Sequence, residues 1–201
     1  DVHVVLPLSV PAMGYTTLTV HAGFEGLPTR HPAVPGLATS ERSMANEHLI
    51  VTIEANGTLA ITDRATGRTY SRLLTFEDCA DIGDGWFHGP AVNDQTFTST
   101  ACGADVALVH DGPYLTTFRV RVPLRLPAEF DFCSMTRSET FIEVVIDSRI
   151  TLRRGARHVE VETTIDNCAR DHRLRVLFPT GAATDTYLAD AAFDVVERPI
   201  A

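Results

Sequence analysis

The chain has 201 residues, a hydrophobic content of 44%, a charged content of 21% and a formal net charge of −9 at neutral pH. This length suits one substantial core, and the acidic balance without a dense arginine cluster excludes the usual nucleic-acid binder. No apolar run reaches the roughly 18 residues that a membrane span needs, so we expect neither nucleic acid nor membrane as a partner.

The N-terminal part is predicted to lie outside the main domain. Residues 1–25 contain two apolar runs around a turn, which we interpret as the terminal strands of a preceding small β domain. Residues 26–43 are rich in proline, glycine and polar residues without periodicity, which is typical of a linker. The stretch DVHVVLPLSVP lacks the basic region and cleavage site of a secretory signal, so we expect a cytoplasmic protein. Both ends resemble cuts in a longer protein, and the absence of lysine indicates a GC-rich, bacterial source.

From residue 44 onward the pattern predicts strands. Asn56-Gly57 stands between two apolar runs, which is the strongest short-range indication of a hairpin. In FRVRVPLRL the apolar residues alternate with arginines, which predicts a half-buried strand. Pro123 cannot donate to a ladder, so that strand should lie at an edge or be bulged there. The expected strands are residues 48–54, 58–62, 118–126, 141–152, 159–165 and 174–179, with 141–152 central in its sheet.

The sequence contains no convincing amphipathic helix. Long strands, turn signals and the lack of crossover helices predict an all-β fold, an antiparallel sandwich covering residues 44–201. The four cysteines, Cys79, Cys102, Cys133 and Cys168, are widely spaced. This spacing excludes zinc ribbons and CxxC redox motifs and favours free, buried thiols, with one or two disulfides as the alternative.

The stretch FEDCADIGDGWFHGPAVND, residues 76–94, looks least like scaffold. Its aspartates are not spaced as in an EF-hand loop, and no His-x-His pair offers a zinc site, so we expect no metal here. Two of its carboxylates could form an acid–base pair, but aspartates that cap turns are the simpler interpretation. No serine or cysteine nucleophile motif is present.

A second polar group follows the strand at 159–165. It comprises Asp166, Asn167, Asp171, His172, Arg173 and Arg175. These residues could form a functional network at one end of the sandwich, although structural pairing with turn backbone is the simpler interpretation.

Several motifs resemble the C-terminal β region of glycoside hydrolase family 38, the α-mannosidases. They are NEHLIV, NGTL, DRATGRTY, FEDCADIGDGW and DNCARDHRLRVLFPT, in this order. The resemblance implies a β supersandwich of the galactose mutarotase-like type. It also implies that a longer protein hydrolyses terminal α-mannosides with retention, using an aspartate nucleophile and zinc in a catalytic α/β domain.

None of those catalytic residues has a match in this chain. We therefore expect no catalytic residue, no metal ligand and no cofactor in the fragment, and expect zinc only in the missing domain. The family often has a tyrosine near the sugar where this chain has Trp86, after Asp81-Ile82-Gly83-Asp84-Gly85. An indole keeps an apolar face and one N–H donor. We predict Asp84, Trp86 and His88 as substrate-binding residues.

Three functions remain open. The first is a non-catalytic β domain that supports the catalytic domain of the same polypeptide and contributes to the rim of an α-mannoside site. The second is a free-standing carbohydrate-binding module with Trp86 as its platform. The third is a purely structural domain that contacts only its neighbour, with Trp86 in its core.

Overall fold

The computed structural model describes residues 4–21 and 35–200, and its regular structure in the second range consists almost entirely of strands. One 3-10 turn, η1 (Ser99–Ala101), interrupts them. The strands are β1 (Ala38–Ser40), β2 (Ser43–Ala45), β3 (Leu49–Ile53), β4 (Leu59–Asp63), β5 (Thr69–Leu73), β6 (Thr75–Ala80), β7 (Phe97–Thr98), β8 (Asp105–Asp111), β9 (Leu115–Pro127), β10 (Phe130–Asp131), β11 (Thr136–Arg137), β12 (Phe141–Arg153), β13 (Glu160–Ile165), β14 (His172–Leu177), β15 (Thr186–Asp190) and β16 (Val195–Pro199).

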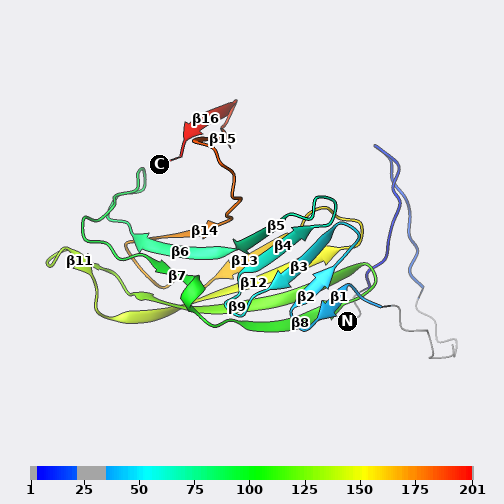
Figure 1. Ribbon diagram of the computed structural model, residues 1–201, viewed down its shortest axis with the longest axis horizontal. Helices are drawn as coiled ribbons and strands as arrows, with labels where there is room; N and C mark the ends of the chain where they lie inside the picture. Colours follow the sequence, from blue (N-terminus) through cyan, green and yellow to red (C-terminus); the bar gives the residue numbers. More distant parts are fainter. Residues whose placement is uncertain (1–3, 22–34, 201) are drawn as a thin grey trace.

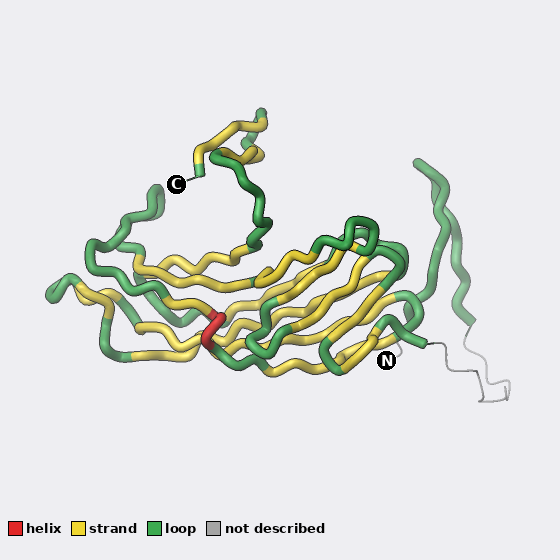
Figure 2. Tube along the Cα trace, in the orientation of Figure 1, coloured by secondary structure: helices red, strands yellow, loops and turns green. Residues whose placement is uncertain are grey.

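The strands form antiparallel sheets that stack on one another (Figure 1). One layer is the sheet β13-β12-β9-β8. The other combines the sheet β1-β2-β3-β4-β5 with the sheet β14-β6-β7. Side chains from both layers form one hydrophobic core, which includes Met44 and Val51 from one side and Phe118 and Ile146 from the other. The predicted all-β antiparallel fold is confirmed, and strand dominates the chain trace (Figure 2).

The longest ladder joins β9 and β12, which pair over 13 residues each. The alternation in FRVRVPLRL is confirmed, because its apolar side chains from Phe118 to Leu126 are at most 3% exposed. β12 is central, as predicted, with β9 and β13 on either side. β9 is not an edge strand, but its last partner in β8 is Asp105, opposite Arg121. Pro123 therefore lies beyond the end of β8, where no ladder on that side needs its missing N–H.

The predicted Asn56-Gly57 hairpin is present between β3 and β4. Gly57 has a φ of +83°, and a Cβ there would press on Val120 and Val122 of the facing layer. Asn56 Oδ1 accepts hydrogen bonds from the backbone N–H and the hydroxyl of Thr58, at 3.1 and 2.8 Å. Both residues of the motif are thus used by the turn itself.

Some predictions on the flanks differ from the structure. Residues 4–21 are exposed and contain no strand, and residues 22–34 of the predicted appendage and linker lie outside the described ranges. The remainder of the predicted linker contains β1 and begins β2. The four cysteines are free but not buried, because Cys79 and Cys102 are partly exposed and Cys133 and Cys168 are exposed. Among the described residues, the structure contains no apolar helix of membrane-spanning length.

The sandwich is open along one side, between β13 and β14. The apolar side chains of Val161 and Ile165 on β13 are 37% and 39% exposed. Together with Leu174 and Val176 of β14 they line a cavity of about 280 Å³. The hairpin β15–β16 projects away from the layers beyond this side (Figure 1). Both regions leave apolar surface uncovered by the described chain, as interaction surfaces do.

The side-chain amide of Asn46 joins the two layers, and both its nitrogen and its oxygen make two hydrogen bonds. Its Nδ2 donates to the carbonyl oxygens of Arg153 and Ala156 at 2.7 and 2.8 Å. Its Oδ1 accepts from the backbone N–H groups of His48 and Leu49 at 2.9 and 2.8 Å. Asn46 is 7% exposed, so these four bonds hold the β2–β3 turn against the end of β12.

We expect Asn46→Ala to lower the free energy of unfolding by about 3 kcal/mol, because it leaves several buried backbone groups without partners. Urea unfolding followed by circular dichroism measures the change. Asn93→Ala, on an exposed loop, is the matched control and should stay close to the unmodified protein. Equal midpoints for the two variants would show that Asn46 does not join the layers.

Candidate functional site

The loop of residues 81–96 leaves β6 at one end of the sandwich and returns as β7. Asp81 organises its first half. The carboxylate oxygen Oδ1 accepts hydrogen bonds from the N–H groups of Gly83 and Gly89, at 3.1 and 2.9 Å. The Ile82 amide donates to the Gly89 carbonyl at 2.9 Å, which brings the two ends of this half of the loop together. The hydrogen bonds that Asp81 accepts, above all the one from Gly89, hold the pKa of Asp81 below its ordinary value.

The glycines of this loop are required by close approach rather than by flexibility. A Cβ on Gly83 would overlap the carbonyl oxygen of Phe87, and one on Gly89 would overlap the backbone of Gly83. The two backbone segments therefore approach more closely than any other residue type permits. The sequence D-x-G-D-G-W-F-H-G thus specifies the shape of the loop.

Asp84 caps the next turn, and the turn carries the aromatic residues. Its Oδ1 accepts hydrogen bonds from the N–H groups of Trp86 and Phe87, at 2.8 and 3.2 Å. Trp86 is 95% exposed and Phe87 63% exposed. The core position that the third possibility gave to Trp86 is therefore wrong for the described part of the chain. Asp84 holds the backbone from which the indole projects.

His88 faces back into the loop. Its Nδ1 lies 3.2 Å from Asp81 Oδ2, and its side chain is 31% exposed. The structure thus brings the three predicted binding residues, Asp84, Trp86 and His88, into one loop. Two of them face backbone or carboxylate partners within it, and the indole faces outward. Their predicted role in substrate binding remains a prediction.

A buried polar network lies beneath this loop. Asp78 is completely buried on β6, and its two oxygens face Arg137 Nη1 and His172 Nδ1, each at 2.5 Å. His172 Nε2 lies 2.9 Å from Asn167 Oδ1, and Arg137 Nη1 also reaches the Gln95 carbonyl oxygen at 3.5 Å. The side chains of Arg137 and His172 are only 3% and 5% exposed.

Only part of this network was found from the sequence. Asn167 and His172 belong to it, whereas Arg175 forms an exposed pair with Glu77 on the sheet surface. Asp171 accepts a hydrogen bond from the Phe130 amide at 3.3 Å, and its own carbonyl oxygen accepts the Asp81 amide at 3.0 Å. Asp78 and Arg137 were missed.

A signal for Asp78 was available. Phe76, Asp78 and Ala80 alternate along β6 and all face inward, so Asp78 is an acid at a core position. A buried carboxylate requires a cationic or hydrogen-bonding partner. The sequence could have predicted that such a partner exists, but not that Arg137, 59 residues away, supplies it.

In the described part of the chain, no three His, Cys, Asp or Glu side chains lie close enough to hold a metal ion. The donors therefore do not fit the zinc that the family resemblance places in a catalytic domain.

Comparison with known proteins places this site in a family context. The family model described as glycosyl hydrolases family 38 C-terminal domain matches residues 44–201. A protein of Halalkalibacterium halodurans with the provisional name mannosylglycerate hydrolase is 29% identical over 174 residues, which cover 80% of this chain and 19% of that protein.

Two solved structures from Enterococcus faecalis are similar. One is a protein in glycosyl hydrolase family 38, at 34% identity and a TM-score of 0.78 over 85% of this chain and 22% of that one. The other is an alpha-mannosidase of strain V583, at 36% identity and a TM-score of 0.76 over 81% of this chain and 20% of that one. The chain thus spans about a fifth of the length of these relatives. The resemblance and the supersandwich fold class inferred from the sequence are both confirmed.

The bonds of Asp81 predict a pH-dependent loop. Because the pKa of Asp81 is lowered in the folded loop, its stabilising effect is present above the ordinary value of 3.8 and is lost as the pH falls through the lower, folded value. NMR chemical shifts of the Gly83 and Gly89 amides should titrate together below pH 3.8. Asp81→Asn should abolish this titration; its persistence would assign it to another group.

Removal of Asp78 should be costly. We expect Asp78→Ala to lower the free energy of unfolding by about 3 to 5 kcal/mol, because Arg137 would remain buried without its carboxylate. Glu160→Ala is the matched control, since Glu160 pairs with Arg153 on the surface with half-exposed side chains. It should cost about 1 kcal/mol or less. Thermal unfolding of both variants measures the difference, and similar costs would contradict a structural role for the network.

Proposed function

Because the chain belongs to glycosyl hydrolase family 38 through its C-terminal domain, we propose that it is the non-catalytic β-sandwich of a longer α-mannosidase. In this proposal the partner is a catalytic α/β domain of the same polypeptide, which supplies the nucleophile and the zinc ligands. The sandwich supports that domain and contributes the loop 81–96 to the rim of the site that holds a terminal α-mannoside.

One observation carries the rim role, which is the exposure of Trp86. An indole that is 95% exposed has its apolar faces free to contact a ligand or another protein surface, and the neighbouring Phe87 adds to this exposed apolar area. The backbone that carries it is nevertheless held, because Asp84 accepts a hydrogen bond from its amide and Asp81 closes the loop before it. An exposed aromatic residue on a held backbone needs less ordering when a ligand binds.

The chemistry of the indole suits a sugar. Its flat face can cover the C–H side of a pyranose ring, and its N–H can donate to a hydroxyl group. In this arrangement Asp84 and His88 act on the sugar through the loop, since Asp84 accepts from backbone amides and His88 faces Asp81. Trp86 itself makes the contact with the α-mannoside.

The same exposure of Trp86 favours a second candidate, a free-standing carbohydrate-binding module. The two functions differ in what binding depends on. A module binds mannose oligomers by itself with an affinity that Trp86→Ala abolishes. A rim loop gains most of its effect when the catalytic domain holds the sugar against it.

We expect Trp86→Ala, made in the longer protein, to reduce kcat/KM for an aryl α-mannoside by about tenfold or more, because part of the contact with the sugar is lost. Thermal unfolding should stay the same, since the side chain is exposed. Val109→Ala is the control, because Val109 is an exposed apolar residue on β8, outside the loop 81–96. An unchanged kcat/KM for Trp86→Ala would refute the rim role, and zinc-dependent hydrolysis by this chain alone would refute the non-catalytic role.

A further inference from the structure

The hairpin β10–β11 forms one wall of a cavity of about 820 Å³. It lies at the same end of the sandwich as the loop 81–96 (Figure 1). The two are joined directly, because Asp171 lines the cavity and its carbonyl oxygen accepts the Asp81 amide at 3.0 Å. Nothing in the sequence alone indicates this cavity, since its lining residues come from two separate segments, 129–139 and 170–171.

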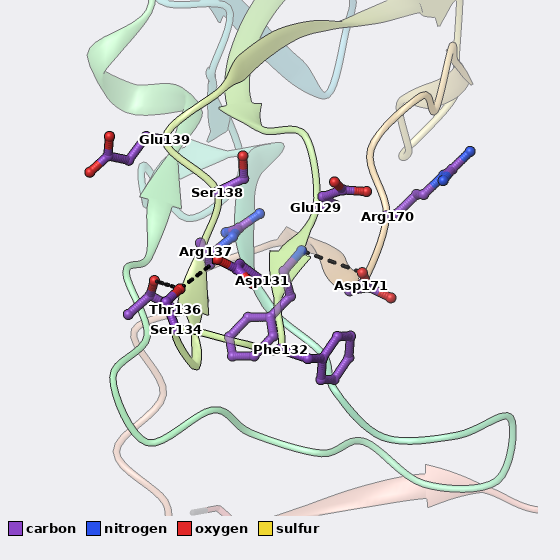
Figure 3. A pocket seen from close by; sticks show the side chains of 11 residues that line it. Glu129, Asp131, Phe132, Ser134, Thr136, Arg137, Ser138, Glu139, Arg170 and Asp171 are labelled. Carbon is purple, nitrogen blue, oxygen red and sulfur yellow. Dashed lines mark hydrogen bonds between the residues drawn. The ribbon is translucent and has the colours of Figure 1, made fainter.

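The lining combines groups that require opposite kinds of hydrogen-bond partner. Glu129, Asp131, Glu139 and Asp171 offer carboxylate oxygens that accept hydrogen bonds. Arg137 offers a donor, because its Nη1 is held by Asp78 whereas its Nη2 is buried and has no hydrogen-bond partner among the described residues. Figure 3 shows the Arg137 guanidinium between Ser138 and Asp131 at the cavity wall.

The cavity also has an aromatic wall. Phe132 is 58% exposed, and its ring packs edge-on against Phe130 with 5.2 Å between the ring centroids. Phe130 itself is buried, so it fixes the position of the exposed ring. Asp131 makes the turn rigid by accepting hydrogen bonds from the Cys133 amide and the Ser134 hydroxyl, each at 2.8 Å. The aromatic surface is therefore preformed.

These features exclude most small ligands. Four carboxylates against two arginines, one of which is already paired with Asp78, disfavour an anion. A metal ion would need converging ligands, and no such group exists in the described part of the chain. A neutral polyol ring offers hydroxyl donors to the carboxylates, hydroxyl acceptors to Arg137 and a C–H face to Phe132. A hydroxyl group can both donate and accept a hydrogen bond, so it can pair with the carboxylates and with Arg137.

We propose that the cavity between the β10–β11 hairpin and Asp171 is a saccharide-binding site. It takes a neutral sugar ring, with Phe132 against the ring face and Glu129 accepting from hydroxyl groups at the rim. It is a site additional to Trp86, and the bond between Asp171 and Asp81 links the two. Only the choice of a mannoside as the first probe rests on the proposed function.

Titration of the chain with methyl α-mannoside, methyl α-glucoside and methyl α-galactoside, followed by NMR amide shifts, tests the proposal. At least one probe should give saturable shifts at residues 129–138. Phe132→Ala and Glu129→Ala should each weaken that binding by about tenfold, as loss of a central contact does. Both side chains are exposed, so neither variant should unfold, and Phe193→Ala is the matched control.

The proposal would be overturned if the amides of residues 129–138 did not shift with any of the three sugars. It would also be overturned if neither variant weakened the binding that those shifts report. Amides around Trp86 report separately in the same spectra. The hydrolysis assay of Trp86→Ala does not depend on the cavity, so the saccharide site and the rim role can fail independently.

Discussion

A buried carboxylate that must be paired fixes one end of this sandwich. Asp78 has no exposure to solvent, and an unpaired charge there would be prohibitively costly. Its partners, Arg137 and His172, come from β11 and β14, so three segments distant in sequence are held together at one point. The loop with Trp86 leaves β6 just after Asp78, and the cavity hairpin ends at Arg137. Both candidate binding surfaces therefore depend on this one cluster of charges.

The structure separates rigid support from exposed contact. Core residues of β9 and β12 are almost completely buried and form a stiff platform. On that platform, Asp81, Asp84 and Asp131 use their carboxylates to hold backbone amides in short turns. The turns then present Trp86 and Phe132 to solvent. This division suits a domain that positions contacts for a reaction taking place on a neighbouring domain, as we propose.

The sequence predicted the fold well because its signals are local. Alternation in FRVRVPLRL, the Asn56-Gly57 turn and the β-branched run of β12 each express a period or a φ preference within a few residues. The site was predicted only in part. Asp84, Trp86 and His88 share one loop, which the motif suggested. The inward position of Asp78 could have been predicted only from the alternation of inward and outward residues along β6. The pairing of Asp78 with Arg137 and the cavity at β10–β11 arise from long-range contacts that no local pattern encodes.

A crystal structure of the longer protein with a bound, unhydrolysed α-mannoside would test the proposed role most directly. The account predicts that the sugar ring lies in van der Waals contact with the face of the Trp86 indole, with the loop 81–96 in the conformation described above. A Trp86 side chain packed against a neighbouring domain, with no contact to the sugar, would contradict it.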